Sequence, residues 1–154
     1  MVSAGEQKRG RIHYQITEKN LDVYASMKFL ERKSCGAMLW FIGRVRDHNE
    51  GQFVTGITYE TSVPHAMKSF YEICNEVHQN FGCDLEISIV HRVGELKVGD
   101  WSILVGVASP HRVNAYEASR FVIEEIKKRT PIWKKEHYES KESRWLKGTP
   151  LHAT

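Results

Sequence analysis

The sequence predicts an α+β fold in a single domain. Alternating and continuous apolar runs, typical of strands, are interspersed with stretches of helical period. The resulting order is β-α-β-β-α-β-β-α-β, and short turns join several successive strands, which favours an antiparallel or mixed sheet with helices segregated to one side. At 154 residues and 41% hydrophobic content, the chain is long enough for one domain with a real core.

The N-terminal part begins with a polar, basic segment, residues 1–11, which we expect to be a mobile arm. The residues that follow alternate with polar ones as in a half-buried strand: Ile12, Tyr14 and Ile16. Asn20 is a good N-cap for a short helix that ends near residue 30. The apolar side of this helix would be Leu21, Tyr24, Met27 and Leu30.

The next element is a continuous apolar run, residues 36–43, whose length and aromatic content predict a strand buried on both faces. Residues 44–51 read as a polar turn. A second strand follows, with Ile57 and Tyr59 on one face.

A long helix begins at Pro64 and ends before Gly82, a suitable residue just beyond a helix. Its apolar stripe would be Met67, Phe70, Cys74, Val77 and Phe81. Two further strands are predicted on either side of a turn marked by Gly94 and Gly99-Asp100. Their alternating apolar residues are Leu85, Ile87 and Ile89, then Trp101, Ile103, Val105 and Val107.

A second long helix is predicted over residues 114–129. Its inner stripe would be Ala115, Ala118, Val122 and Ile126. After Pro131 the chain reads as extended. The domain is expected to cover residues 12–146, followed by a polar tail at residues 147–154.

The segment of residues 127–136 places five cationic side chains around Pro131 and Trp133. Proline disfavours helix at the preceding residue and has no N–H to continue it. Lys127 and Lys134 therefore lie on either side of a rigid corner, which suits a site that binds an anion and places an amine beside it. The alternative is a basic helix end that complements the helix dipole.

Two other cationic pairs lie next to strand and helix ends. His111-Arg112 precedes a helix, where free N–H groups favour a bound anion, and Arg44 and Arg46 follow a strand. Solvated surface charge is the alternative for both pairs. Clustered cations lower one another's pKa, so Lys127 or Lys134 is a candidate nucleophile or base. Glu136 is placed to orient one of these lysines, or is simply a solvated surface residue.

Composition excludes several classes of protein. The net charge of +3 does not by itself imply nucleic acid, and the eight histidines form no metal-binding motif. No apolar run approaches the length of a membrane helix. The odd number of cysteines, without a CxxC motif or an apolar signal core, indicates reduced thiols in a cytoplasmic protein.

The chain resembles the large, catalytic subunit of molybdopterin synthase, the MoaE family, from about residue 36 to residue 145. Several ordered motifs carry the resemblance: FIGRVRDHN (41–49), HRVGEL (91–96), GVASPHR (106–112), YEA (116–118) and KKRTPIWKKE (127–136). Pro110 departs from the small residue expected before the histidine and stiffens that loop. The resemblance implies an α/β hammerhead-like fold with an additional antiparallel sheet.

The same resemblance implies a sulfurtransferase that converts cyclic pyranopterin monophosphate into molybdopterin and forms its dithiolene, with no cofactor or metal of its own. Sulfur would arrive as a thiocarboxylate on the C-terminal Gly-Gly of a small ubiquitin-like subunit. This chain ends in Leu151-His152-Ala153-Thr154, so it is not the sulfur carrier itself. The implied assembly is a homodimer of this chain within a heterotetramer, without nucleic acid or membrane.

The motifs also imply the site residues. Lys127 and Lys134 would be catalytic, and His111-Arg112 would reach the pocket across the dimer interface. The full set of substrate-binding positions would be Arg44, Val45, Arg46, His111, Arg112, Lys127, Lys134, Lys135 and Glu136.

Two other functions are compatible with parts of the sequence. A basic module without catalysis could bind RNA or another phosphate-rich partner, with Trp133 and Trp145 stacking on bases. The basic segments, however, are tied to element ends and form no RNA-binding motif. A persulfide sulfurtransferase would use one of three cysteines, Cys35, Cys74 or Cys83, but none has a clear basic neighbour.

Overall fold

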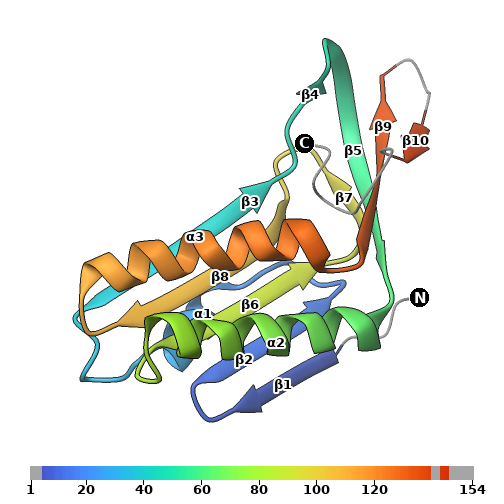
Figure 1. The fold of residues 1–154 in the computed structure, drawn as a ribbon. Helices are drawn as coiled ribbons and strands as arrows, with labels where there is room; N and C mark the ends of the chain where they lie inside the picture. The colour runs from blue at the N-terminus through green and yellow to red at the C-terminus, as the bar shows by residue number, and fades with distance from the viewer. Residues whose placement is uncertain (1–4, 140–142, 146–154) are drawn as a thin grey trace.

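The computed structural model of the protein describes residues 5–139 and 143–145, the latter as backbone only. One five-stranded sheet forms its base (Figure 1). Strands β2 and β6 run parallel and the other neighbours antiparallel, so the sheet is mixed, as predicted. In sheet order the strands are β1 (Gly5–Arg9), β2 (Ile12–Thr17), β6 (Glu86–Arg92), β8 (Trp101–Ser109) and β3 (Ala37–Arg44).

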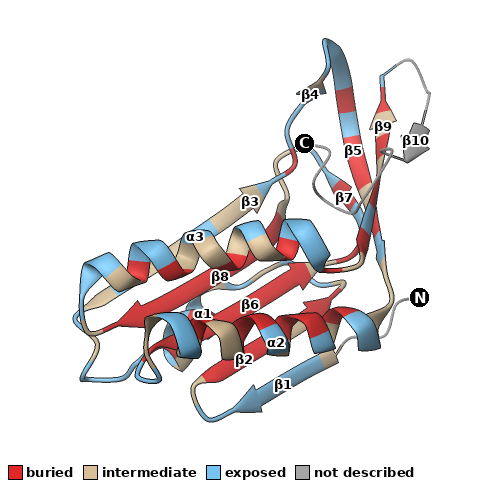
Figure 2. Cartoon of the chain, in the orientation of Figure 1, coloured by how far each residue is buried: buried red, intermediate tan, exposed pale blue. Residues whose placement is uncertain are grey.

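Helices α2 (Val63–Phe81) and α3 (Arg112–Arg129) cover one face of this sheet (Figure 1). The core lies between them and the sheet, where buried residues are concentrated (Figure 2). Both predicted stripes are confirmed at their centres, and Met67 and Phe81 at the ends of the first are partly buried. The fully buried members are Phe70, Cys74 and Val77 of α2, and Ala115, Ala118, Val122 and Ile126 of α3.

Helix α1 (Val23–Phe29) lies on the opposite face, so the expectation that all helices share one side was wrong. It packs directly over the backbone of Gly106 in β8. A Cβ atom there would lie 2.7 Å from Leu30 Cδ1 and 2.9 Å from Ser26 Oγ, distances that no real side chain tolerates. Because side chains alternate along a strand, Gly106 faces away from the core side of β8.

The limits of α1 also differ from the prediction. Asp22, not Asn20, is the N-cap, and its carboxylate accepts hydrogen bonds from the backbone N–H groups of residues 24 and 25. Tyr24 is 72% exposed and Met27 39% exposed, whereas Ser26 and Leu30 are buried. The small Ser26 faces the sheet because α1 approaches the Gly106 backbone too closely for a larger side chain.

A second sheet projects beyond one end of the first (Figure 1). Strand β5 is its centre and pairs with β9 on one side and with β7 and β4 on the other. The short strands β4, β7 and β10 were not predicted, because two to four residues carry too little alternation. The strands are β10 (Ser143–Trp145), β9 (Ile132–Tyr138), β5 (Gln52–Thr61), β4 (His48–Asn49) and β7 (Gly94–Lys97).

The expected mobile arm is wrong for residues 5–9, which form β1 and pair antiparallel with β2. An edge strand gains its stability from backbone hydrogen bonds and needs few apolar side chains, so its sequence reads as polar. Residues 1–4, and the expected polar tail at residues 147–154, lie outside the described residues.

Strand β3 is the other edge of the main sheet, not a strand buried on both faces. It pairs with β8 alone among the described strands. Met38 is 46% exposed and Phe41 39% exposed, because α3 covers only part of one face. Among the described residues, no helix combines the length and apolar character that crossing a membrane requires.

Candidate active site

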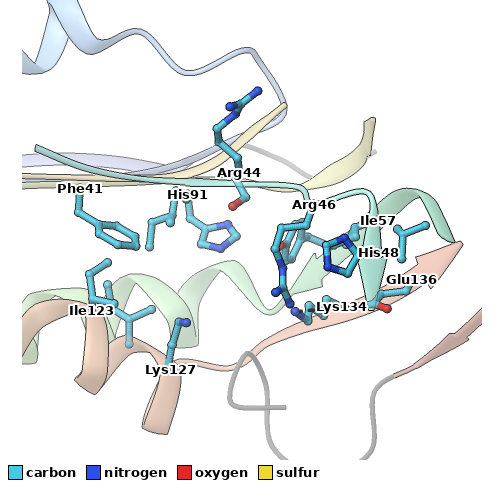
Figure 3. A pocket seen from close by; sticks show the side chains of 16 residues that line it. Phe41, Arg44, Arg46, His48, Ile57, His91, Ile123, Lys127, Lys134 and Glu136 are labelled. Carbon is cyan, nitrogen blue, oxygen red and sulfur yellow. Dashed lines mark ion pairs between the residues drawn. The ribbon is translucent and has the colours of Figure 1, made fainter. Parts of the chain in front are cut away.

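A cavity of about 320 Å³ lies where the two sheets meet, beside the C-terminal end of α3 (Figure 3). Six strands and one helix contribute to its lining. From the N-terminus onward, the lining residues are Phe41, Gly43, Arg44, Arg46, His48, Val54, Ile57, Tyr59, His91, Ser102, Ile103, Ile123, Ile126, Lys127, Lys134 and Glu136.

The chain leaves the main sheet at the end of β3, where its register with β8 shifts between Gly43 and Arg44. Val45 is then held by two backbone hydrogen bonds, to residues 99 and 100, and its side chain is 3% exposed in the core. Arg44 and Arg46 consequently point in opposite directions (Figure 3). Arg46 enters the cavity, whereas Arg44 Nε donates to the Gly99 carbonyl at 3.3 Å.

Lys127 lies in the last turn of α3, at the mouth of the cavity. The corner predicted at Pro131 is present: α3 ends at Arg129, and its C-cap Thr130 is extended. The Thr130 hydroxyl lies 2.8 Å from Ser69 Oγ of α2, and Arg129 is paired with Glu76 of α2. These contacts fix the end of α3, and with it the backbone position of Lys127.

Strand β9 presents alternate residues to the cavity. Lys134 and Glu136 face inward, with Lys134 Nζ 4.0 Å from Glu136 Oε1 (Figure 3). The Tyr138 hydroxyl donates to Glu136 Oε2 at 2.7 Å and fixes the carboxylate. Lys135 lies in the opposite phase of the strand and does not line the cavity.

Lys134 is the most perturbed cation in the site. Its side chain is buried, and its pKa is lowered to about 8, mainly by burial. Glu136 opposes this shift, whereas Lys127 and Arg46 add to it. The expected cause was repulsion among cations, but loss of solvent is the larger effect. With that pKa, about a tenth of the amine is neutral at pH 7, enough for a nucleophile or base.

Neutral residues form the opposite wall of the cavity. His91 is fully buried, which lowers its pKa to about 4, and its Nδ1 lies 2.8 Å from the Arg92 carbonyl. The rings of His91 and Tyr59 pack edge to face, with their centroids 5.1 Å apart. The pKa of Tyr59 is raised to about 12, mainly by burial, and a hydrogen bond with Ser102 partly opposes this shift.

Neither His91 nor Tyr59 was predicted from the sequence as a site residue. One signal was available: Ile87, Ile89 and His91 share one phase of β6, so a histidine continues an apolar, inward-facing series. Alternation places such a residue inside the fold but does not reveal whether it meets the core or a cavity.

His111 and Arg112 lie at the other end of α3 and are both exposed. Fifteen residues of helix separate Arg112 from Lys127, or roughly 22 Å at 1.5 Å per residue. One chain therefore does not bring this pair to the cavity. His111 makes no capping hydrogen bond with its side chain.

The cysteines stand apart from the site, since none of the three lines the cavity. Cys74 packs in the core, where burial strongly raises its pKa, and burial also raises the pKa of Cys35. A raised pKa disfavours the reactive thiolate. Among the described residues, no three potential ligands (His, Cys, Asp or Glu) gather in a group that could hold a metal ion.

Comparison with known proteins identifies relatives over most of the chain. A family model described as "MoaE protein" matches residues 16–129. The molybdopterin synthase catalytic subunit of Synechococcus elongatus is 47% identical over 141 residues, covering 92% of this chain and 86% of that protein. The protein of the same name from Dictyostelium discoideum is 38% identical over 140 residues, covering 90% and 89%.

A solved structure has the same fold. The crystal structure of molybdopterin synthase from Staphylococcus aureus superposes with a TM-score of 0.82 and 34% sequence identity. The superposition covers 86% of this chain and 96% of that one. The hammerhead-like α+β fold expected from the motifs is confirmed by this likeness.

Proposed function

The chain belongs to the MoaE protein family, and we propose that it is the catalytic subunit of a molybdopterin synthase. It would transfer sulfur to cyclic pyranopterin monophosphate and so form the dithiolene of molybdopterin, a step in molybdenum cofactor biosynthesis. The observation that carries the proposal is the cavity in which the buried amine of Lys134 lies among Arg46, Lys127 and Glu136. A cyclic phosphate and a thiocarboxylate are both anions, and this wall of the cavity is cationic.

In the proposed reaction, Arg46 and Lys127 bind the phosphate and attract the sulfur donor. The thiocarboxylate sulfur attacks a side-chain carbon of the substrate and forms a C–S bond, while a C–O bond at that carbon breaks and its oxygen leaves with the opened cyclic phosphate or as water. Water then cleaves the acyl–sulfur bond and leaves a carboxylate on the carrier. Each transfer requires proton movement, for which Lys127 and Lys134 are the candidates. Glu136, held by Tyr138, stabilises the protonated form of Lys134 between steps.

The proposed sulfur donor is a small ubiquitin-like subunit with a C-terminal Gly-Gly thiocarboxylate. Support comes from the relatives, whose name, "catalytic subunit", implies a further subunit. The three described thiols are free, and none of them lines the cavity. This arrangement favours an external sulfur donor over a persulfide on this chain. The same thiols support a reducing location, the cytoplasm.

We further propose a homodimer within a heterotetramer, with a composite active site. His111 and Arg112 are exposed at the far end of α3 and reach a cavity only if it belongs to a second copy. Exposed apolar residues near that end suit burial in an interface: Met38 of β3, with Val113 and Tyr116 of α3. Arg44, Val45 and Lys135 do not point into their own chain's cavity, so any contact they make with substrate would involve backbone atoms or the second copy.

The deciding experiment combines purified protein, cyclic pyranopterin monophosphate and the thiocarboxylated small subunit, and measures molybdopterin. Product is expected only with the thiocarboxylate, and the same subunit with an ordinary carboxylate is the control. A variant with Cys35, Cys74 and Cys83 changed to Ser should stay active if it folds. Loss of sulfur transfer in that folded variant would instead favour the persulfide mechanism, and tight, salt-sensitive RNA binding without turnover would favour the basic binding module.

A further inference from the structure

The two walls of the cavity differ in what they can recognise. The wall built by Arg46, Lys127 and Lys134 offers cationic donors, with the Glu136 carboxylate beside Lys134. The opposite wall is mostly apolar, and its polar side chains are His91, Tyr59 and Ser102. Figure 3 places His91 between Phe41 and Arg46. A ligand that fills the cavity would therefore meet charge at one end and His91 at the other.

The protonation of His91 follows from its hydrogen bond. Nδ1 lies 2.8 Å from the Arg92 carbonyl oxygen, which can only accept, so Nδ1 must carry the proton. In the neutral ring Nε2 is then a bare acceptor. Burial keeps the ring neutral, because it lowers the pKa of His91 to about 4.

The acceptor nitrogen is left for a ligand. His91 is 1% exposed, yet it lines the cavity, and no described residue donates a hydrogen bond to Nε2. Tyr59 is not the donor to Nε2, because its ring packs against His91 and its hydroxyl forms a hydrogen bond with Ser102. Nε2 is not among the fully buried atoms of the described residues that lack a partner, which fits an atom that opens on the cavity. There a ligand or water can supply the donor.

We propose that His91 is a substrate-recognition residue, whose Nε2 accepts a hydrogen bond from an N–H group on the heterocyclic end of the substrate. The inference rests on the proposed function and orients its substrate: phosphate toward Arg46 and Lys127, heterocycle toward His91. Reduced pterins carry several ring and amino N–H donors and no cation, which matches a neutral acceptor. Phe41 and Ile103 supply apolar surface beside it for the planar ring.

The test separates recognition of the heterocycle from recognition of phosphate. Calorimetry would measure the binding of cyclic pyranopterin monophosphate and, separately, of inorganic phosphate. His91→Phe keeps the ring volume but removes the acceptor. It should weaken binding of the pterin roughly tenfold, the effect of one buried hydrogen bond, and leave phosphate binding unchanged.

Two further variants guard against a structural artefact. His91→Gln places an amide oxygen near the position of Nε2 and should restore most of the lost affinity. His65→Phe changes a surface histidine of α2 that does not line the cavity, and should bind both ligands like the unmodified protein. Thermal denaturation of each variant would check that it is folded.

The outcomes are distinct. If the unmodified protein fails to bind the pterin at all, the proposed function fails. If it binds, and His91→Phe binds equally well, the role of His91 is overturned while the function stands. Equal losses for pterin and phosphate in His91→Phe, without rescue in His91→Gln, would make His91 a purely structural residue and also overturn the inference.

Discussion

The two ends of helix α3 carry similar cations in opposite surroundings. At the C-terminal end, Lys127 meets Arg46 and the buried Lys134 around one cavity. At the N-terminal end, His111 and Arg112 are exposed and do not line this cavity. Both pairs were selected from the sequence for the same reason, a position at the end of an element. The same pattern in the sequence therefore marks a cavity at one end of the helix and an exposed surface at the other, which the proposed dimer would bring to a second copy's cavity.

The largest effect is expected at the C-terminal end. Lys127→Ala should reduce turnover by about a hundredfold or more, because a positioned amine that transfers protons is lost. Lys127→Arg should be nearly as inactive, since guanidinium keeps the charge but does not deprotonate. Single-turnover kinetics would measure both, with partner binding as a control. Near-normal turnover of Lys127→Arg would assign the chemistry to Lys134.

The second prediction tests whether the two ends meet across a dimer. Inactive His111→Ala and inactive Lys127→Ala proteins, mixed after subunit exchange, should regain roughly a quarter of normal activity, because half of the dimers are hybrids with one intact pocket of two. Exchange itself would be followed with tagged subunits. Activity that stays at the level of the separate variants after complete exchange would place the whole pocket within one chain.

A third prediction compares the arginines of the two ends. Arg46→Ala and Arg112→Ala should each weaken substrate binding by about 1–3 kcal/mol, since each removes a charge-assisted hydrogen bond to the anion. Calorimetry at one protein concentration that keeps the dimer and one that dissociates it distinguishes the contributions of the two arginines. The loss from Arg46→Ala should persist when the dimer is diluted apart, whereas the contribution of Arg112 should disappear. Unchanged binding in both variants would remove them from the site.

The smallest expected effect is a shift of the pH profile. If the neutral amine of Lys134 is the active form, the rate should rise as pH passes about 8. Glu136 raises the pKa of Lys134, so Glu136→Gln should move this rise to lower pH. Arg46 lowers that pKa, so Arg46→Ala should move it to higher pH. Profiles of kcat that rise at the same pH in all three proteins would exclude Lys134 as the titrating group.

Much of the fold could be predicted because helical and strand periods record burial directly. The centres of the α2 and α3 stripes match buried positions, as do Ile12, Tyr14 and Ile16 of β2. The prediction that β2 is half-buried was wrong, because residues of its other face, such as His13, are buried too. The edge strands were harder. Strand β1 lacks apolar residues because its backbone supplies its stability. Strand β3 is apolar although none of its residues is fully buried and Met38 and Phe41 are exposed. The periodic spacing of apolar residues predicts which side chains face the core. It does not predict the edge strands of a sheet, which can be polar or apolar whether or not they face the core.

The site was predicted only in part. Charge next to element ends selected Arg46, Lys127, Lys134 and Glu136, which the fold brings together around one cavity. The same rule selected Lys135, which strand alternation places on the opposite face. It could not find His91, a neutral residue of the interior that lines the cavity. Recognising such a residue requires knowing where the interior is hollow, which depends on how the two sheets meet.

The pairing of β9 with β5 has a consequence for how the protein is made. Residues 132–138 deliver Lys134 and Glu136, yet they pair with a strand more than seventy positions earlier in the chain. The cavity therefore cannot form until nearly the whole chain has been synthesised. Until then β5 keeps one open edge, a surface that recruits other strands. A chain interrupted before Ile132 would be inert toward substrate and prone to aggregate, so the same strand that completes the catalyst also protects the nascent protein.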